Sequence, residues 1–217
     1  ADTFTILENG VTYEVFLNDG LRTGIFLDQH EVRDGLVNGL ALGKSVLNMF
    51  SYTAAFSVAA AMGGAIETTS VDLAKRSREL STAHFEANGF SMDNHRLVVM
   101  DVFDYFKYAK KKGLSYDLIV IDPPSFARNK KRTFSANKDY HKLIAQSLDI
   151  LSEHGTIIAS TNAANMTVQQ FKKQLRKGLG DVSADFVNLQ QLPADFTVNP
   201  NDPTSNYLKV YTIKVNK

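Results

Sequence analysis

The sequence lacks several features that would assign it to large classes of proteins. Among its 217 residues there is no cysteine, no tryptophan and only 5 prolines. The lack of cysteine excludes disulfides, thiolate metal sites and a cysteine nucleophile within this chain. No apolar run approaches the roughly 20 residues of a membrane-spanning helix, and no leader of basic and then apolar residues opens the sequence. We therefore expect a cytoplasmic location and no membrane contact.

An excess of charge of one sign is also absent, because 24 basic residues stand against 23 acidic ones. Composition alone therefore indicates no partner, and any binding of nucleic acid must depend on local clusters of cations. The histidines are scattered without the spacing of metal ligands, so we interpret them as surface or capping residues and expect no metal. They are His30, His84, His95, His141 and His154.

The order of the predicted elements indicates an α/β fold. Asn9-Gly10 between two short strands, 4–8 and 11–17, predicts an N-terminal hairpin. From residue 44 strands and helices alternate, which predicts a parallel sheet covered on both faces. The last two strands have no helix between them, so they predict an antiparallel hairpin at one edge. The strands are expected at 45–50, 66–71, 96–100, 116–121, 156–160, 182–191 and 206–215, and the helices at 31–40, 55–62, 73–88, 103–112, 137–151 and 167–179.

Aspartates stand at or just past the ends of three successive predicted strands: Asp72, Asp101 and Asp122. Open α/β sheets bind ligands at the carboxyl ends of their strands. There Asp72 can accept hydrogen bonds from both ribose hydroxyls of an adenosine, and Asp101 can receive the adenine amino group or fix the loop around it. The alternative for either residue is a helix N-cap, a role worth about 1 kcal/mol.

Asp122 also opens the segment Asp122-Pro123-Pro124-Ser125-Phe126, directly after an apolar strand. Neither proline has an N–H to donate, so the sheet ends there and the backbone is fixed. A carboxylate, a carbonyl and an aromatic ring are then held rigidly at the sheet edge. This arrangement suits a flat, polar substrate such as a nucleobase.

The loop after the first strand of the alternating region, residues 48–56, does not match Gly-x-Gly-x-x-Gly, so a dinucleotide fingerprint is absent. Ser51 and Thr53 are good helix N-caps, and the helix behind them can face an anionic group such as a carboxylate. Together with the three aspartates, the loop describes a pocket for an adenosine and an amino acid. That is the shape of S-adenosylmethionine.

Four cations flanked by two phenylalanines lie just beyond the Asp-Pro-Pro segment. Cations that pair with phosphates and rings that stack on bases are typical of nucleic-acid binding, although an exposed polar loop is the alternative. The cations are Arg128, Lys130, Lys131 and Arg132, and the rings belong to Phe126 and Phe134.

Several of these motifs resemble a known family, the class I S-adenosylmethionine-dependent methyltransferases that modify large-subunit ribosomal RNA. The resemblance runs from about Glu8 to the C-terminus. It rests on Thr-Gly-Ile-Phe-Leu-Asp-Gln at 23–29, Asn-Met-Phe-Ser-Tyr-Thr at 48–53, Ser-Val-Asp at 70–72, Asp-Leu-Ile-Val-Ile-Asp-Pro-Pro-Ser-Phe at 117–126, and the closing strands. It implies a Rossmann-like fold whose seven-stranded sheet is mostly parallel with an antiparallel edge strand. It divides the chain into a hairpin and cofactor-covering segment, 1–40, and a methyltransferase domain, 41–217.

The resemblance also implies roles for residues of this chain. S-adenosyl-L-methionine is the expected cofactor, with segment 23–29 folded over it, and large-subunit rRNA is the expected partner. The catalytic residues implied are Asp122, Pro123 and Phe126. The cofactor-binding residues implied are Thr23, Asp28, Gln29, Asn48, Phe50, Ser51, Tyr52, Thr53, Asp72, Leu73, Asp101, Val102 and Asp122. Relatives often carry a further RNA-binding domain, so we expect such a domain or a partner outside this chain to contribute.

Within this family one branch resembles cytosine-C5 methyltransferases and another modifies guanine N7. C5 of a pyrimidine becomes nucleophilic only after a thiolate adds to C6. Where the C5 branch carries its cysteine, this chain has Ser160-Thr161-Asn162-Ala163. The closing segments at 192–196 and 206–213 are also more similar to the N7 branch. Guanine N7, or an exocyclic amine, is therefore the expected target atom.

Ala54 departs from the family, because relatives usually have glycine there. Either its methyl group crowds the methionine part of the cofactor, or the loop needs no positive φ at this position. The departure motivates one alternative function, a catalytically weak RNA-binding or assembly factor on a methyltransferase fold. Another alternative is a methyltransferase of a small molecule or a protein.

Overall fold

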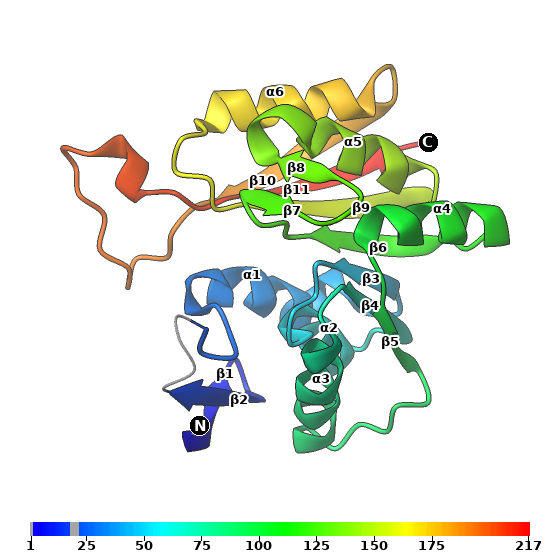
Figure 1. The fold of residues 1–217 in the computed structure, drawn as a ribbon, viewed down its shortest axis with the longest axis vertical. Helices are drawn as coiled ribbons and strands as arrows, with labels where there is room; N and C mark the ends of the chain where they lie inside the picture. The colour runs from blue at the N-terminus through cyan, green and yellow to red at the C-terminus, as the bar shows by residue number, and fades with distance from the viewer. Residues whose placement is uncertain (1, 18–21) are drawn as a thin grey trace. The chain divides into compact units, whose positions relative to one another are not determined.

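The computed structural model describes residues 2–17 and 22–217, and the chain divides into two compact units, Ala1–Val102 and Phe103–Lys217 (Figure 1). The strands of the first unit are β1 (Asp2–Glu8), β2 (Val11–Leu17), β3 (Ser45–Met49), β4 (Glu67–Asp72) and β5 (His95–Val99). Its helical elements are η1 (Leu27–Gln29), α1 (His30–Gly35), η2 (Leu36–Leu40), α2 (Ala55–Met62) and α3 (Lys75–Ala87).

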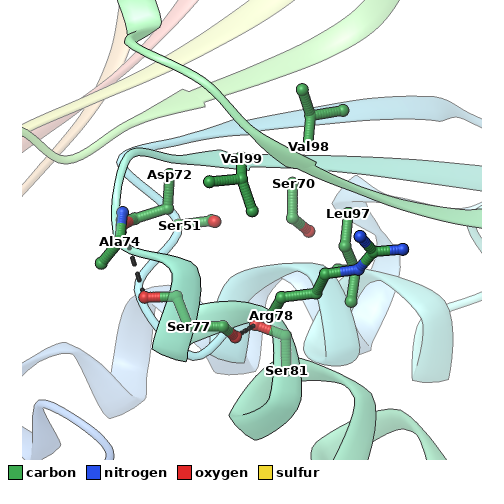
Figure 2. Close-up of a pocket in the computed structure, with 10 residues that line it drawn as sticks. All are labelled: Ser51, Ser70, Asp72, Ala74, Ser77, Arg78, Ser81, Leu97, Val98 and Val99. Carbon is green, nitrogen blue, oxygen red and sulfur yellow. Dashed lines mark hydrogen bonds between the residues drawn. The ribbon is translucent and has the colours of Figure 1, made fainter.

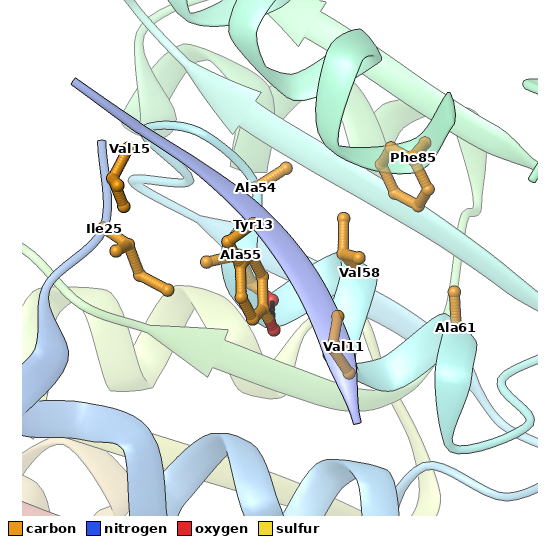
Figure 3. Packing of buried hydrophobic residues seen from close by; sticks show 9 residues of the cluster. All are labelled: Val11, Tyr13, Val15, Ile25, Ala54, Ala55, Val58, Ala61 and Phe85. Atoms are coloured by element: carbon orange, nitrogen blue, oxygen red, sulfur yellow. Dashed lines mark hydrogen bonds between the residues drawn. The ribbon is translucent and has the colours of Figure 1, made fainter. Parts of the chain in front are cut away.

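The predicted N-terminal hairpin is confirmed. β1 and β2 pair antiparallel around Asn9 and Gly10, which both take positive φ, at 54° and 78°. The inner side chains of β2, Val11 and Tyr13 among them, pack in one buried cluster with α2 and Phe85 of α3 (Figure 3). The hairpin is therefore anchored to the helices that follow the parallel strands.

The helix expected at 31–40 is regular only as far as Gly35. It continues as the π-helical turn η2, because Asn38 and Gly39 leave the helical region, Gly39 with φ 137°. Glycine has no Cβ and adopts that φ without strain, so the chain can change direction at this turn before it enters β3.

The second unit contains β6 (Tyr116–Ile121), β7 (Phe126–Arg128), β8 (Thr133–Ser135), β9 (Leu151–Thr161), β10 (Ser183–Gln190) and β11 (Lys209–Asn216). Its helical elements are α4 (Val102–Lys112), α5 (Ala136–Leu148), α6 (Val168–Leu179) and η3 (Pro203–Ser205). α4 begins one residue before the boundary between the two units. α5 and α6 lie side by side (Figure 1). Their close approach needs Gly178, because a Cβ there would lie 2.5 Å from Ile144 Cβ.

The expected seven-stranded sheet is present, and its strand order is β10-β11-β9-β6-β3-β4-β5. β3, β4 and β5 pair in parallel, and so do β6 and β9. β11 runs antiparallel to both β9 and β10, so the closing hairpin forms the edge. One element was missed: the loop after Pro124 contains the small antiparallel hairpin β7–β8, whose strands have 3 residues each. No helix within residues 2–17 and 22–217 is both long and apolar enough to cross a membrane.

Candidate functional site

The loop between β3 and α2 has an unusual backbone. Phe50, Tyr52 and Ala54 have φ of 60°, 51° and 61°, in the left-handed region, whereas Ser51 and Thr53 between them do not. For residues other than glycine this region costs roughly 1–2 kcal/mol each. Such strain persists only where surrounding contacts enforce it, and it concentrates at functional sites.

The prediction that Ser51 and Thr53 cap α2 is wrong. The N-cap is Ala54, and no side chain caps the helix. The Thr53 hydroxyl instead donates to Gly24 O at 2.6 Å, and the Ser51 carbonyl accepts from Ala54 N at 2.7 Å. Ala54 has positive φ in the structure, so the alternative that the loop needs no positive φ at this position is wrong. Ala54 is fully buried in the cluster with Val11 and Tyr13 (Figure 3).

The segment 23–29 lies against this loop. Besides the bond from Thr53 to Gly24, the rings of Phe26 and Tyr52 are 5.4 Å apart. Gly24 has φ 95°, and a Cβ there would meet Glu14 O at 2.8 Å, so only glycine fits. Within the segment Thr23 is exposed, Asp28 is half-buried and Gln29 is buried. The structure therefore joins the segment to the loop, and its expected position over the cofactor stays a prediction.

Arg33 supports the same segment from α1. Its guanidinium donates to Phe26 O at 2.8 Å and to both carboxylate oxygens of Glu8, at 2.6 and 2.8 Å. The Arg33 and Glu8 side chains are only 2% and 9% exposed. Sequence reasoning missed this pair, because 25 residues separate its members.

Asp72 joins the loop to the end of β4. Its carboxylate accepts from Tyr52 N at 2.9 Å, from Ala74 N at 2.9 Å and from Ser77 Oγ at 3.3 Å. The side chain is half-buried, and it lines a pocket between α3 and the strands β4 and β5 (Figure 2). The pocket is lined by Ser51, Ser70, Asp72, Ala74, Ser77, Arg78, Ser81, Leu97, Val98 and Val99.

The other predicted cofactor residues of this unit are placed as follows. Leu73, next to Asp72, is 56% exposed. Asp101 is half-buried and directly precedes α4, whereas Val102 is buried. Phe50 is half-buried in the loop itself. Asn48 is buried and donates to Ser57 Oγ at 3.0 Å, which directs that amide into the core.

These residues fit an adenosine-containing cofactor. A carboxylate has about four acceptor positions, and Asp72 uses three, so one acceptor position remains for a ribose hydroxyl. The exposed side chain of Leu73 beside it offers apolar surface. The strained loop is held in place before any ligand arrives, as a preformed site requires.

In the second unit, Asp122 and Pro123 follow β6 at its carboxyl end. Asp122 is half-buried, Pro123 is buried, and Phe126 at the start of β7 is 61% exposed. The hydroxyl of Tyr140 on α5 is shared between Ser160 O at 2.7 Å and Ile121 O at 3.2 Å. Burial, and secondly the charge of Asp122, raises the pKa of Tyr140, so its proton stays in place. Tyr140 thus fixes the ends of β6 and β9 together.

The four cations of the β7–β8 hairpin divide into two pairs. Arg132 and Lys131 bind the Asp104 carboxylate at 2.7 and 3.2 Å, and the Arg132 guanidinium lies 5.1 Å from the Phe103 ring centre. The hydrogen bond from Lys131 is the main cause of a lowered pKa of Asp104. Arg128 and Lys130 are exposed, and their side chains have no hydrogen bond or ion pair within the described part of the chain. Of the predicted RNA-binding residues, these two face solvent unpaired.

Two histidines are buried, contrary to their interpretation as surface or capping residues. His84 is 1% exposed, with Nδ1 2.8 Å from Thr53 O and Nε2 3.1 Å from Glu14 O. His95 is 7% exposed, hydrogen-bonds Thr68 Oγ1 at 2.8 Å and stacks on Phe85. His84 therefore supports the loop 50–54. From the sequence, only its apolar neighbour Phe85 could have indicated that His84 is buried.

Comparison with known proteins gives consistent matches. The family model of S-adenosylmethionine-dependent methyltransferases matches residues 1–209. YwbD of Bacillus subtilis, provisionally named a ribosomal RNA large subunit methyltransferase, is 48% identical over 96% of this chain and 53% of its own length. Ribosomal RNA large subunit methyltransferase K of Neisseria meningitidis is 36% identical over 90% of this chain and 54% of its own.

Among solved structures, SMU.776, provisionally described as a methyltransferase and complexed with SAH, is similar. It aligns with a TM-score of 0.96 and 72% identity, over 98% of this chain and 56% of that one. The chain thus spans about half the length of the curated relatives it matches.

Proposed function

Since this chain belongs to the S-adenosylmethionine-dependent methyltransferase family, we propose that it methylates a base of large-subunit ribosomal RNA, at guanine N7 or an exocyclic amine. The family confirms the predicted cofactor, S-adenosyl-L-methionine. The observation that carries the substrate proposal is the rigid Asp122-Pro123 edge, fixed by Tyr140 and followed by an exposed aromatic ring. Relatives named for large-subunit rRNA support the same substrate.

The first unit holds the cofactor in this proposal. Asp72 accepts a ribose hydroxyl at its remaining acceptor position, Leu73 covers the adenine, and the loop Phe50–Thr53 contacts the methionine part. Asp101 and Val102 border the adenine, and Thr23, Asp28 and Gln29 belong to the covering segment. Asn48 acts indirectly, because its amide is bonded inside the core. When bound, S-adenosylmethionine supplies a methyl group on a positively charged sulfur.

The second unit orients the base. The Asp122 carboxylate and the Pro123 carbonyl accept hydrogen bonds from N–H groups of the base edge, and Phe126 stacks on a base. Guanine N7 has a free lone pair, so orientation against the methyl group is sufficient. For an exocyclic amine, the same two acceptors stabilise the nitrogen as it becomes nucleophilic. The covalent cytosine-C5 route needs a thiolate, and this chain has no cysteine.

The remaining predictions belong to the same proposal. Arg128 and Lys130 contact phosphates directly, whereas Lys131 and Arg132 chiefly hold the hairpin to Asp104. We retain the division into a covering segment, 1–40, and a methyltransferase domain, 41–217. An RNA-binding domain or partner outside this chain and a cytoplasmic location also remain proposals.

The test is transfer of labelled methyl groups from S-adenosylmethionine to unmodified large-subunit rRNA, followed by nucleoside analysis. We expect a 7-methylguanosine or an N-methylated base. Exclusive 5-methylcytosine would overturn the mechanism. Calorimetry in parallel separates the alternatives: micromolar binding of the cofactor without any RNA product would favour a small-molecule or protein substrate, and no binding would favour a non-catalytic RNA-binding factor.

A further inference from the structure

A buried lysine holds the turn that follows β9. Lys209, at the start of β11, is 2% exposed, and its ammonium donates to Ala163 O at 2.7 Å and Met166 O at 2.5 Å. Removing an ammonium group from water is costly, and burial lowers the pKa of this lysine. Both hydrogen bonds go to carbonyls of one short turn, so the charge is used to fix that turn.

Other hydrogen bonds make the same turn, residues 162–166, rigid. Met166 N donates to Ala163 O at 3.1 Å, and Ala163 N to Thr161 Oγ1 at 3.3 Å. The Asn165 amide oxygen accepts from Asn137 on α5 at 3.1 Å. Asn162 and Asn165 are both exposed, but within residues 2–17 and 22–217 the side chain of Asn162 has no hydrogen-bond partner.

The sheet register places this free amide at the edge that carries Asp122. β6 and β9 are parallel, with Ile121 opposite Ala159, so Asp122, directly past the end of β6, lies level with Ser160, the next-to-last residue of β9. Tyr140 bonds to the carbonyls of Ile121 and Ser160 and keeps that level fixed. Asn162 therefore directly follows β9, the strand beside β6, on a turn with a fixed backbone.

We propose that Asn162 is a base-reading residue, which hydrogen-bonds the edge of the target nucleobase, and that Lys209 is a positioning residue for it. A planar amide offers two donors and one acceptor, which match the mixed pattern of a nucleobase edge. Asp122 offers only acceptors, so Asn162 adds the donor that a base carbonyl requires. This inference rests on the proposed function, since it assumes an RNA base as substrate.

The experiment compares Asn162→Ala with Asn165→Ala, an amide of the same turn whose oxygen is already bonded. Methyl transfer to unmodified large-subunit rRNA and to RNAs with each other nucleotide at the target position gives kcat/KM and discrimination. Asn162→Ala is expected to lower both about tenfold, as for the loss of a hydrogen bond to a base edge. Asn165→Ala is expected to stay within about twofold, and cofactor affinity by calorimetry to be unchanged in both.

Lys209→Met and Lys209→Arg test the positioning role. The methionine variant keeps most of the length of the side chain and removes both hydrogen bonds to the turn, so it should reduce discrimination between nucleotides as Asn162→Ala does. The Lys209→Arg variant should restore much of that discrimination. A Lys209→Met variant that melts at a lower temperature but discriminates normally would make Lys209 merely structural and overturn its part. Wild-type rates and discrimination in Asn162→Ala overturn the base-reading role. Wild-type protein that binds the cofactor but leaves rRNA unmethylated overturns the proposed function itself, and this inference with it.

Discussion

The regions proposed to hold the cofactor and the target base are made rigid in different ways. In the first unit, the loop 50–54 holds three strained backbone positions, enforced by remote groups such as His84, Asp72 and the segment around Gly24. In the second unit, rigidity begins in the sequence itself, with two prolines, and Tyr140 completes it. Cofactor binding should therefore be sensitive to distant substitutions, and base orientation mainly to local ones.

The largest test of this difference concerns Arg33, which holds the segment at Phe26 and pairs with Glu8, 25 residues away. Arg33→Met leaves the Glu8 carboxylate buried without its partner, so the free energy of unfolding should fall by about 3–5 kcal/mol. Chemical denaturation measures this. The control is the double variant Arg33→Met with Glu8→Met, which should recover much of the loss. A fall no larger than that of an exposed ion pair would show that the first unit does not depend on this contact.

The second test separates the two sides directly through Asp72 and Asp122. Asp72→Ala should weaken cofactor binding about 10- to 100-fold, because hydrogen bonds to a charged group are worth about 1.5–3 kcal/mol each. Asp122→Ala should slow single-turnover transfer about 100-fold with nearly unchanged cofactor affinity, as for the loss of an oriented polar group. Calorimetry and rapid-quench kinetics give the two quantities. Equal cofactor affinity in wild type and Asp72→Ala would reject the ribose assignment, and an unchanged transfer rate in Asp122→Ala the target-base assignment.

A smaller effect is expected for Tyr140→Phe. Loss of the hydroxyl leaves the buried carbonyls of Ile121 and Ser160 without that donor, which costs about 1–3 kcal/mol. The melting temperature should fall and base discrimination should decline, whereas cofactor affinity should not change. Phe171, whose ring packs against Tyr140 and has no hydroxyl, offers a packing control as Phe171→Leu. Weaker cofactor binding in Tyr140→Phe would remove the distinction between the two sides.

The smallest effect concerns pH and the first unit. Burial lowers the pKa of His95 below its ordinary value of 6.5, so below that pH the unfolded chain binds more protons than the folded one. The contribution of His95 to stability is therefore complete above pH 6.5 and is lost as the pH falls toward the lowered pKa. Denaturation of wild type and His95→Gln across this range measures it. If the free energy of unfolding changed equally with pH in both proteins, His95 would not be the source of this pH dependence.

The sequence predicted the elements that have strong local patterns. The apolar run at 116–121, the alternation of strands and helices and the closing antiparallel pair all appear where expected, because burial on both faces produces them directly. The prediction that Ser51 and Thr53 are N-caps was wrong, because contacts with residues distant in the sequence impose the conformation of that loop. The hairpin β7–β8 was not predicted, because strands of 3 residues carry almost no hydrophobic periodicity.

The candidate site was predicted in the same uneven way. Asp72 and Asp122 could be placed because Asp72 ends a recognisable strand, β4, and Asp122 follows another, β6. Lys209 and Arg33 could not be placed, since their partners are 43–46 and 25 residues away and a charged residue gives no sign of burial in its own surroundings. Long-range polar contacts of this kind become visible only when the chain is folded.

The pairing of Lys131 and Arg132 with Asp104 has a consequence for the ionic-strength dependence of RNA association. One carboxylate offsets one of the two positive charges that share it, so about three rather than four charges of the hairpin should count. For a single strand the plot of log affinity against log salt concentration then has an expected slope of about −2.1 from this hairpin, instead of about −2.8. In the proposed complex with RNA, Asp104 is thus a built-in counterion that weakens indiscriminate attraction to polyanions.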